Sequence, residues 1–183
     1  MSSRDLVYIA LFAAITAALA LFPPFTLPVG GVPITAQSLG PMLAGCILGA
    51  RRGGLALLLF IVLVAIGLPL MPGGRGGLGV IISPSGGFIL GWALGAFVVG
   101  YLVERGWRRL NLVSAGLACV VGGILVVYLV GIPWMATFAG ISLGQAIAVS
   151  AAYVPGDLIK VAVAAAVAVT VKKSYPLIEA KTA

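Results

Sequence analysis

Long apolar runs separated by short groups of charged residues constrain this chain more than any other feature of its sequence. The runs extend from Leu6 to Val171, and 62% of the 183 residues are hydrophobic while only 8% are charged. A soluble domain of this length would carry about a quarter charged residues. The sequence therefore predicts an all-α integral membrane protein, with a single membrane domain over residues 1–183.

A helix that spans a bilayer needs about 20 apolar residues, and six runs meet or approach that length. We expect spans at roughly 6–22, 36–50, 53–70, 88–103, 112–131 and 156–171, with outer loops at 23–35, 71–87 and 132–155. Pro133 and Gly140 interrupt the last of these loops, so we expect only short helices there, lying over the bundle. The first run ends in Pro23-Pro24 rather than a small-residue cleavage site, which favours a retained helix over a signal peptide.

The basic residues orient the expected bundle, because Lys and Arg favour cytoplasmic loops. With both termini cytoplasmic, nine of the 11 basic residues lie on the inner side: Arg4, Arg51, Arg52, Arg105, Arg108, Arg109, Lys172, Lys173 and Lys181. The pair Arg51-Arg52 forms the inner turn between the second and third spans. A seventh span at 141–154 would move the C-terminal Lys pair outside, so the charge rule disfavours it. The pattern predicts a multi-pass membrane protein with this orientation.

Two basic residues, Arg75 and Lys160, fall on the outer side instead, and Asp157 lies one turn before Lys160. Charges near lipid that do not orient a protein usually line a cavity or pathway, so these three predict a site for a small charged ligand. Other interpretations stay open. Arg75 could be a solvated loop residue. Asp157 could be the N-cap or a first-turn acid of the last helix, or it could pair locally with Lys160.

The composition excludes several classes of function. The chain has no histidine and only four acidic residues, so we expect neither an enzyme nor a metal site, and no cofactor. Cys46 and Cys119 lie in apolar runs and are expected to be buried small side chains. The net charge of +7 is spread over short clusters, which favours the lipid bilayer over nucleic acid as a partner.

Glycine-rich segments give no sign of nucleotide binding. The dinucleotide-binding pattern G-x-G-x-x-G occurs once, as Gly74-Arg75-Gly76-Gly77-Leu78-Gly79. That pattern binds a dinucleotide only within a soluble strand–turn–helix unit. No phosphate-binding P-loop sequence is present, so any ATP-driven step requires another polypeptide.

Small residues recur every four positions along the first helix, and such stripes let helices approach closely. The stripe consists of Ala10, Ala14 and Ala18, with Ala13 and Ala17 beside it. It serves either packing within the bundle or docking of another membrane subunit. The GxxxG pairs Gly45/Gly49 and Gly91/Gly95 favour internal packing.

Several motifs, taken together over nearly the whole chain, resemble those of BioY proteins. They are Pro33-Ile34-Thr35-Ala36-Gln37-Ser38-Leu39-Gly40, Gly67-Leu68-Pro69, Gly73-Gly74-Arg75-Gly76-Gly77-Leu78-Gly79, Pro84-Ser85-Gly86-Gly87-Phe88 and Pro155-Gly156-Asp157-Leu158-Ile159-Lys160. The family usually has Tyr where this chain has Phe88, which removes a hydroxyl. Ser85 replaces the usual Thr and keeps its hydroxyl.

The resemblance implies a six-helix S-component of an energy-coupling factor (ECF) transporter, which binds biotin and works with a transmembrane T-component and two cytoplasmic ATPases. It implies biotin contacts for Arg75, Asp157 and Lys160, with Ser85, Gly86, Gly87 and Phe88 nearby, and T-component docking for the alanines of the first helix. The chemistry fits biotin, because its ureido N–H groups suit Asp157 and its carboxylate suits Arg75 or Lys160. Phe88 and Trp134 are the expected apolar walls. A solitary biotin facilitator without ATPase partners is the alternative.

Overall fold

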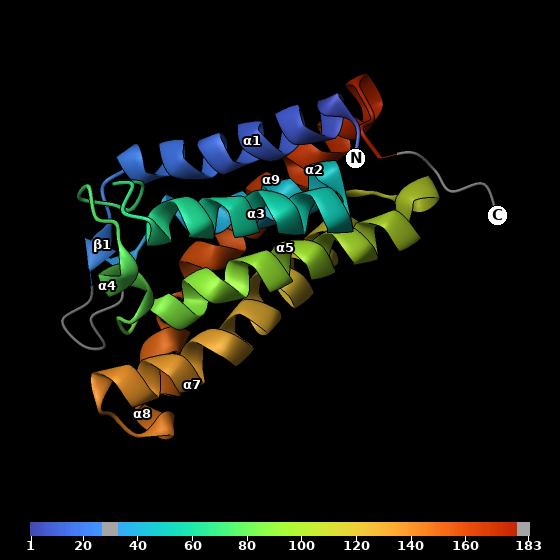
Figure 1. Ribbon diagram of the computed structural model, residues 1–183. Helices are drawn as coiled ribbons and strands as arrows, with labels where there is room; N and C mark the ends of the chain where they lie inside the picture. Colours follow the sequence, from blue (N-terminus) through green and yellow to red (C-terminus); the bar gives the residue numbers. More distant parts are fainter. Residues whose placement is uncertain (27–32, 179–183) are drawn as a thin grey trace.

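The computed structural model describes residues 1–26 and 33–178, and in them the chain forms an elongated bundle of helices (Figure 1). The longer helices are α1 (Ser3–Ala18), α2 (Leu39–Leu48), α3 (Ala50–Ala65), α5 (Gly86–Arg105), α6 (Leu112–Cys119), α7 (Val127–Ala139), α8 (Leu143–Ala151) and α9 (Val154–Ser174). The short elements are α4 (Leu78–Ile81) and the 3₁₀ turns Leu19–Leu21, Ala36–Ser38 and Trp107–Arg109. Strands β1 (Phe25–Thr26) and β2 (Pro33–Ile34) pair antiparallel and are the exception to an all-helical architecture.

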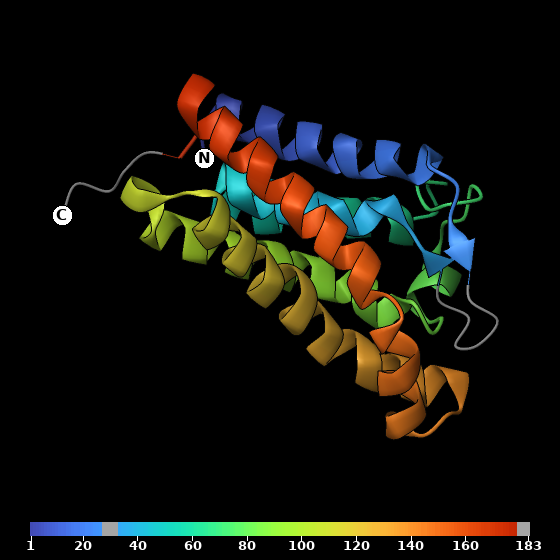
Figure 2. The ribbon, with the colours of Figure 1, turned by 180° about the vertical axis from the view of Figure 1, so that it is seen from behind.

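Four helices in the described part of the chain are long and apolar enough to cross a membrane. They are Ser3–Leu21, Gly86–Arg105, Leu112–Ala139 and Val154–Ser174. The chain is therefore a multi-pass membrane protein, as predicted. Ala36–Leu48 and the 16-residue α3 are shorter, so the six-span topology with cytoplasmic termini stays a prediction. Helix α1 begins and α9 ends at the same end of the bundle (Figures 1 and 2).

The helix after Asn111 extends further than the sequence predicted. Helix α6 passes through a π-helical segment, Val120–Val126, directly into α7, so that one helix runs from Leu112 to Ala139. The expected outer loop at 132–155 is thus wrong up to Ala139, where α7 continues, whereas α8 is one of the short helices expected there. Pro133 does not end the helix, since membrane helices satisfy the freed backbone groups locally. Gly140, with φ of 66°, ends it instead.

The turn between α2 and α3 also differs from the prediction. Arg51 and Arg52 lie in the first turn of α3, and Gly49 alone makes the connection. Its φ of 83° is a conformation that glycine adopts without a steric penalty. Helix α3 ends at Ala65, short of the expected residue 70. Lys181 and residues 27–32 of the expected first outer loop lie outside the described residues.

Helix α5 lies at the centre of the bundle and packs against α2, α3 and α7. The two GxxxG pairs serve internal packing, as predicted. A Cβ atom on Gly45 would lie 2.5 Å from the Ala96 carbonyl oxygen, and one on Gly95 would lie 2.7 Å from that of Gly122. Cys46 and Cys119 are buried as expected, with their Sγ atoms 3.3 Å apart.

Candidate substrate-binding site

The start of α9 carries a buried ion pair. Lys160 Nζ lies 2.8 Å from Asp157 Oδ1, and the two side chains are only 14% and 8% exposed. The local pairing that the i,i+3 spacing allowed is therefore present. Asp157 is not the N-cap, because Tyr153 occupies that position and no side chain caps this helix, but Asp157 is the acidic residue of its first turn, as the sequence also allowed. Two charges held in the bundle lose their hydration, which costs several kcal/mol per ion unless both are paired and hydrogen-bonded.

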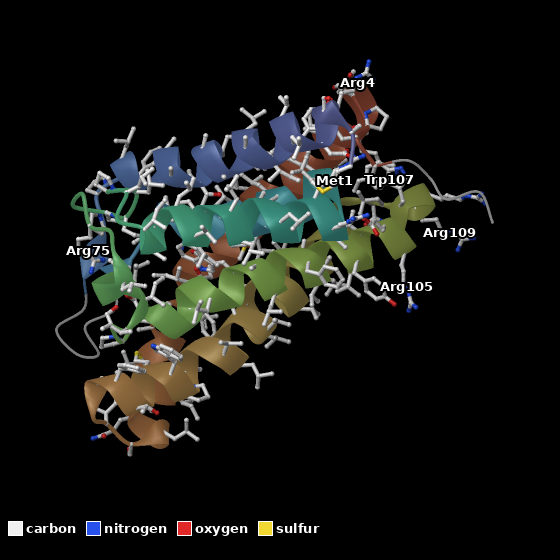
Figure 3. All side chains as sticks on the ribbon, in the orientation of Figure 1. Met1, Arg4, Arg75, Arg105, Trp107 and Arg109 are labelled. Atoms are coloured by element: carbon white, nitrogen blue, oxygen red, sulfur yellow. The ribbon has the colours of Figure 1, made fainter. Side chains whose placement is uncertain are left out.

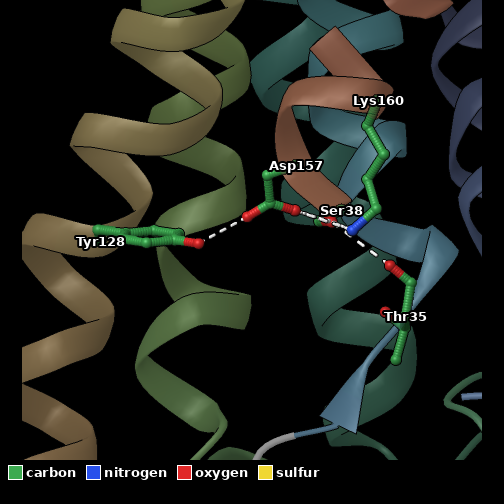
Figure 4. A network of polar contacts seen from close by, with 5 residues as sticks. All are labelled: Thr35, Ser38, Tyr128, Asp157 and Lys160. Atoms are coloured by element: carbon green, nitrogen blue, oxygen red, sulfur yellow. Dashed lines mark hydrogen bonds and ion pairs between the residues drawn. The ribbon is translucent and has the colours of Figure 1, made fainter. Parts of the chain in front are cut away.

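Two further side chains complete the hydrogen bonding of this pair, and both come from other parts of the bundle (Figure 4). The Tyr128 hydroxyl of α7 donates to Asp157 Oδ2 at 2.7 Å. Lys160 Nζ donates to Ser38 Oγ at 2.8 Å, and Ser38 donates to Asp157 Oδ1 at 3.3 Å. Thr35 lies beside the ammonium group. Each carboxylate oxygen thus accepts a hydrogen bond, so the network holds α9, α7 and the turn before α2 together.

An aromatic cluster borders the network on one side. The Phe88 ring of α5 meets Tyr128 edge-on with centroids 5.7 Å apart, and Tyr153 edge-on at 6.3 Å. Trp92 lies one turn further along α5 and faces the same space. Burial raises the pKa of Tyr153, so its phenol stays neutral at pH 7. The cluster supplies an apolar wall with hydroxyl groups at its edge.

Arg75 reaches the site from the glycine-rich loop between α3 and α4. The loop turns back on itself where Met71 N–H donates to the Arg75 carbonyl at 3.0 Å, and Gly74 has a φ of 70°. Arg75 is exposed, its Nε donates to the Pro72 carbonyl at 3.2 Å, and it borders the pocket. Arg75 is therefore a solvent-exposed loop residue whose side chain also borders the pocket, and Figure 3 shows it at one end of the bundle.

The network, the aromatic cluster and Arg75 surround one pocket, lined by Ile34, Thr35, Ser38, Met71, Arg75, Ser85, Phe88, Ile89, Trp92, Gly123, Val127, Tyr128, Tyr153, Asp157 and Lys160. Its volume is about 60 Å³. Pockets for small organic ligands are typically about 300–1,000 Å³. A ligand larger than a few atoms therefore enters only if side chains or loops at the mouth move. The described residues bring together no group of His, Cys, Asp or Glu suited to a metal ion.

Five of the predicted ligand contacts line this pocket, namely Arg75, Ser85, Phe88, Asp157 and Lys160. Gly86 and Gly87 do not line it. A Cβ on Gly86 would lie 2.6 Å from the Ile81 carbonyl carbon, and one on Gly87 would lie 2.6 Å from Trp134 Cγ. These two glycines let α5 approach the α4 segment and α7 closely, which positions Phe88 but leaves the glycines outside the cavity.

Trp134 does not form the apolar wall that the sequence suggested. Its indole N–H donates to the Ser83 carbonyl at 3.0 Å, and its ring stacks on Phe138 with centroids 4.7 Å apart. Beside Phe88, the wall is made by Trp92, Tyr128 and Tyr153, which sequence reasoning missed together with Ser38. Tyr128 could have been found, because a hydroxyl deep in an apolar span usually has a buried polar partner.

The alanines of α1 divide between two faces of the helix. Ala10, Ala14 and Ala18 are exposed, Ala17 is half-buried, and Ala13 is only 3% exposed. Ala13 therefore packs inside the bundle and is not available to a partner. The remaining alanines form a smooth strip on the same helix as the exposed side chains of Leu6 and Leu11, a surface on which another helix could approach closely.

The family of the chain follows from comparison with known proteins. The BioY family model matches residues 1–177. The chain belongs to the BioY family. This BioY protein is 53% identical to the biotin transporter BioY of Rhizobium etli, over 99% of this chain and 100% of that one. It is 48% identical to the biotin transporter BioY of Rhodobacter capsulatus, over 94% of this chain and 95% of the other.

A solved structure has the same fold as this BioY protein. The crystal structure of the S-component for biotin from an ECF-type ABC transporter superimposes with a TM-score of 0.88 and 27% sequence identity. The match covers 94% of this chain and 95% of the other. The similar proteins are transporters, so the role of this family is not enzymatic, in agreement with the sequence.

Proposed function

We propose that this chain is the biotin-binding S-component of an ATP-driven ECF importer of the bacterial cytoplasmic membrane. The observation that carries the proposal is the buried network of Asp157, Lys160, Ser38 and Tyr128 beside an aromatic wall. The Asp157 carboxylate is a hydrogen-bond acceptor, and the Lys160 ammonium group beside it is a hydrogen-bond donor. Membership of the BioY family supports biotin as the ligand.

The ureido ring of biotin carries N–H donors next to a carbonyl acceptor, and this pattern complements the buried pair. Asp157 accepts from a ureido N–H, and Lys160 donates to the ureido oxygen. The biotin carboxylate would be repelled here, because Lys160 Nζ lies 2.8 Å from the Asp157 carboxylate. The carboxylate instead meets Arg75 at the mouth, where the guanidinium has a single backbone acceptor, Pro72, in the described structure. The thiophane ring lies against Phe88 and Trp92.

Titration calorimetry on the detergent-purified chain tests this proposal. Biotin should bind with a 1:1 ratio, whereas thiamine and riboflavin should give no heat above dilution. Absence of biotin binding by protein that melts cooperatively would reject the proposal.

The ATP-driven step requires partners, because this chain contains no phosphate-binding loop. We propose that a transmembrane T-component docks on the exposed alanine strip of α1 and that two cytoplasmic ATPases supply the energy, with no cofactor in this chain. Ala14→Leu together with Ala18→Leu should abolish co-purification of the partners but leave biotin binding unchanged. Ala10→Ser, which barely changes the surface, is the control. Normal partner recovery with the leucine variant would exclude this docking face.

A solitary biotin facilitator is the second candidate, since the pocket alone does not require ATP. Liposomes that contain only this chain distinguish the two. Uptake of labelled biotin without partners would support the facilitator, whereas uptake that appears only with the T-component, both ATPases and ATP supports the importer.

A further inference from the structure

A second and larger cavity lies at the end of the bundle opposite the binding pocket. Its volume is about 950 Å³, and it opens where α3 begins, α5 ends and the turn Trp107–Arg109 follows. Four arginines line it: Arg51, Arg52, Arg105 and Arg108. Figure 3 shows Arg105 and Trp107 at this end, far from Arg75. We call this cavity the basic groove.

The two acids in the basic groove already have partners. Asp5 pairs with Arg52 at 2.7 Å, and Arg52 also donates to the Leu177 carbonyl at 3.1 Å. Glu104 accepts the Ala50 N–H at 2.8 Å and so serves the start of α3. Against the four arginines, these two acids leave a net side-chain charge of +2 in the groove.

Two of the arginines are free to bind an anion. Arg51 and Arg108 are exposed, and neither guanidinium makes a hydrogen bond or ion pair within residues 1–26 and 33–178. Arg105 lies over the Tyr101 ring at 4.6 Å, which fixes its guanidinium at the rim. Arginine presents a planar set of donors that matches the oxygens of a phosphate group.

The apolar part of the groove continues onto the lipid-facing surface of the bundle. Leu55, Phe97 and Tyr101 line the groove. Beyond them, Leu58 on α3 and Leu94 on α5 are 49% and 57% exposed. The spacings 55/58 and 94/97/101 place these side chains on one face of each helix. A free phosphate ion would use the arginines and leave this apolar strip unused.

We propose that the basic groove binds an anionic phospholipid from the adjacent leaflet. The phosphodiester lies between Arg51 and Arg108, and an acyl chain lies along Leu58, Leu94 and Phe97. Tyr101 and Trp107 stand at headgroup level, where aromatic residues of membrane proteins gather. The chemistry recognised is a phosphate monoanion joined to a long apolar chain, and the source is the bilayer.

Native mass spectrometry of the full detergent-purified chain, titrated with dioleoyl phosphatidylglycerol, tests the proposal. Dioleoyl phosphatidylcholine serves as the neutral lipid. The groove variant is Arg51→Gln with Arg108→Gln, and the matched control is Arg4→Gln with Arg109→Gln, which removes two charges at the same end but outside the groove. Each groove arginine near a lipid surface is expected to change the affinity about fivefold. The groove variant should therefore bind phosphatidylglycerol roughly 25-fold more weakly, and the control should differ from wild type by less than about twofold.

Each outcome decides the proposal. Selective loss in the groove variant, with an unchanged melting temperature, supports it. Equal losses in both variants, or equal binding of the two lipids, would overturn it in favour of general charge attraction. Displacement of the lipid by millimolar inorganic phosphate or glycerol phosphate would overturn the lipid source and identify a soluble anion. Loss of the lipid on assembly with partner subunits, together with failure of the groove variant to assemble, would assign the groove to a protein. None of these results depends on biotin binding.

Discussion

The two ends of the bundle carry charge in opposite ways. At the pocket end, Asp157 is buried and Lys160 is mostly buried, and neighbouring side chains hydrogen-bond both the carboxylate and the ammonium group. At the other end, Arg51 and Arg108 are exposed, and neither has an ion-pair partner in the described chain. Burying an ion costs several kcal/mol before pairing compensates it, whereas an exposed arginine at the membrane surface costs little. The buried pair therefore supports the proposed ligand site, whereas the exposed arginines match the position of basic residues at a membrane surface.

The largest effect is expected from removing the buried negative charge. Asp157→Asn should weaken biotin binding by about 1.5–3 kcal/mol, the value of a hydrogen bond to a charged group. It also leaves Lys160 without its ion-pair partner. Calorimetric titration of the purified variant measures the change in dissociation constant.

Glu104→Gln is the matched control, because it makes the same carboxylate-to-amide change at the opposite end. Its amide oxygen can still accept the Ala50 N–H, so biotin affinity should stay at the wild-type value. If Asp157→Asn and Glu104→Gln lost equal biotin affinity, the pocket end would not differ from the basic end in ligand binding.

The hydrogen bond from Tyr128 should contribute the next largest effect, and to stability rather than to binding alone. Tyr128→Phe leaves Asp157 Oδ2 without its donor, which should lower the free energy of unfolding by about 1–2 kcal/mol. Tyr101→Phe is the control. It removes a hydroxyl at the basic end, where the ring rather than the hydroxyl faces Arg105, and should leave the free energy of unfolding unchanged. Thermal unfolding of the ligand-free variants compares them, and an equal melting temperature for Tyr128→Phe and wild type would contradict the network.

Arg75 should have a smaller effect, because it is exposed. Arg75→Gln should weaken binding of biotin by about 0.5–1 kcal/mol, the range of an exposed ion pair, and high salt should reduce the difference. Biotin methyl ester, which lacks the carboxylate, should bind wild type and variant equally. A variant that loses affinity for the ester as much as for biotin would place Arg75 elsewhere than at the carboxylate.

The smallest effect is expected at Phe88. Phe88 is 8% exposed and already held edge-on between Tyr128 and Tyr153. Phe88→Tyr should tighten biotin binding by about 0.5 kcal/mol, the low end for a neutral hydrogen bond. Competition binding against labelled biotin resolves a change of this size, and weaker binding would show that the ring has no room for a hydroxyl.

Charge made part of the site predictable from sequence. Arg75, Asp157 and Lys160 stood out because they did not fit the orientation of the other charges, and the structure brings all three to one pocket. Ser38, Tyr128 and Tyr153 gave no such signal. Their roles depend on which helices lie side by side, and nothing local in the sequence shows that α7 faces the first turn of α9.

Proline and glycine account for the main differences between the predicted and the observed arrangement. Pro133 suggested a loop, but a single proline in a membrane helix is tolerated when neighbouring groups satisfy the backbone, so the helix continues to Ala139. The glycines at 86 and 87, which were expected near the ligand, lie outside the pocket lining and allow close helix packing. Glycine permits both roles, and the sequence does not separate them.

The central claim is that the Asp157–Lys160 pair hydrogen-bonds the ureido ring of biotin. A crystal structure of the purified protein grown with biotin tests it most directly. We predict the ureido ring within hydrogen-bonding distance of both side chains and the carboxylate turned toward Arg75. Biotin bound the other way round, with its carboxylate on Lys160, or bound outside this pocket, would contradict it.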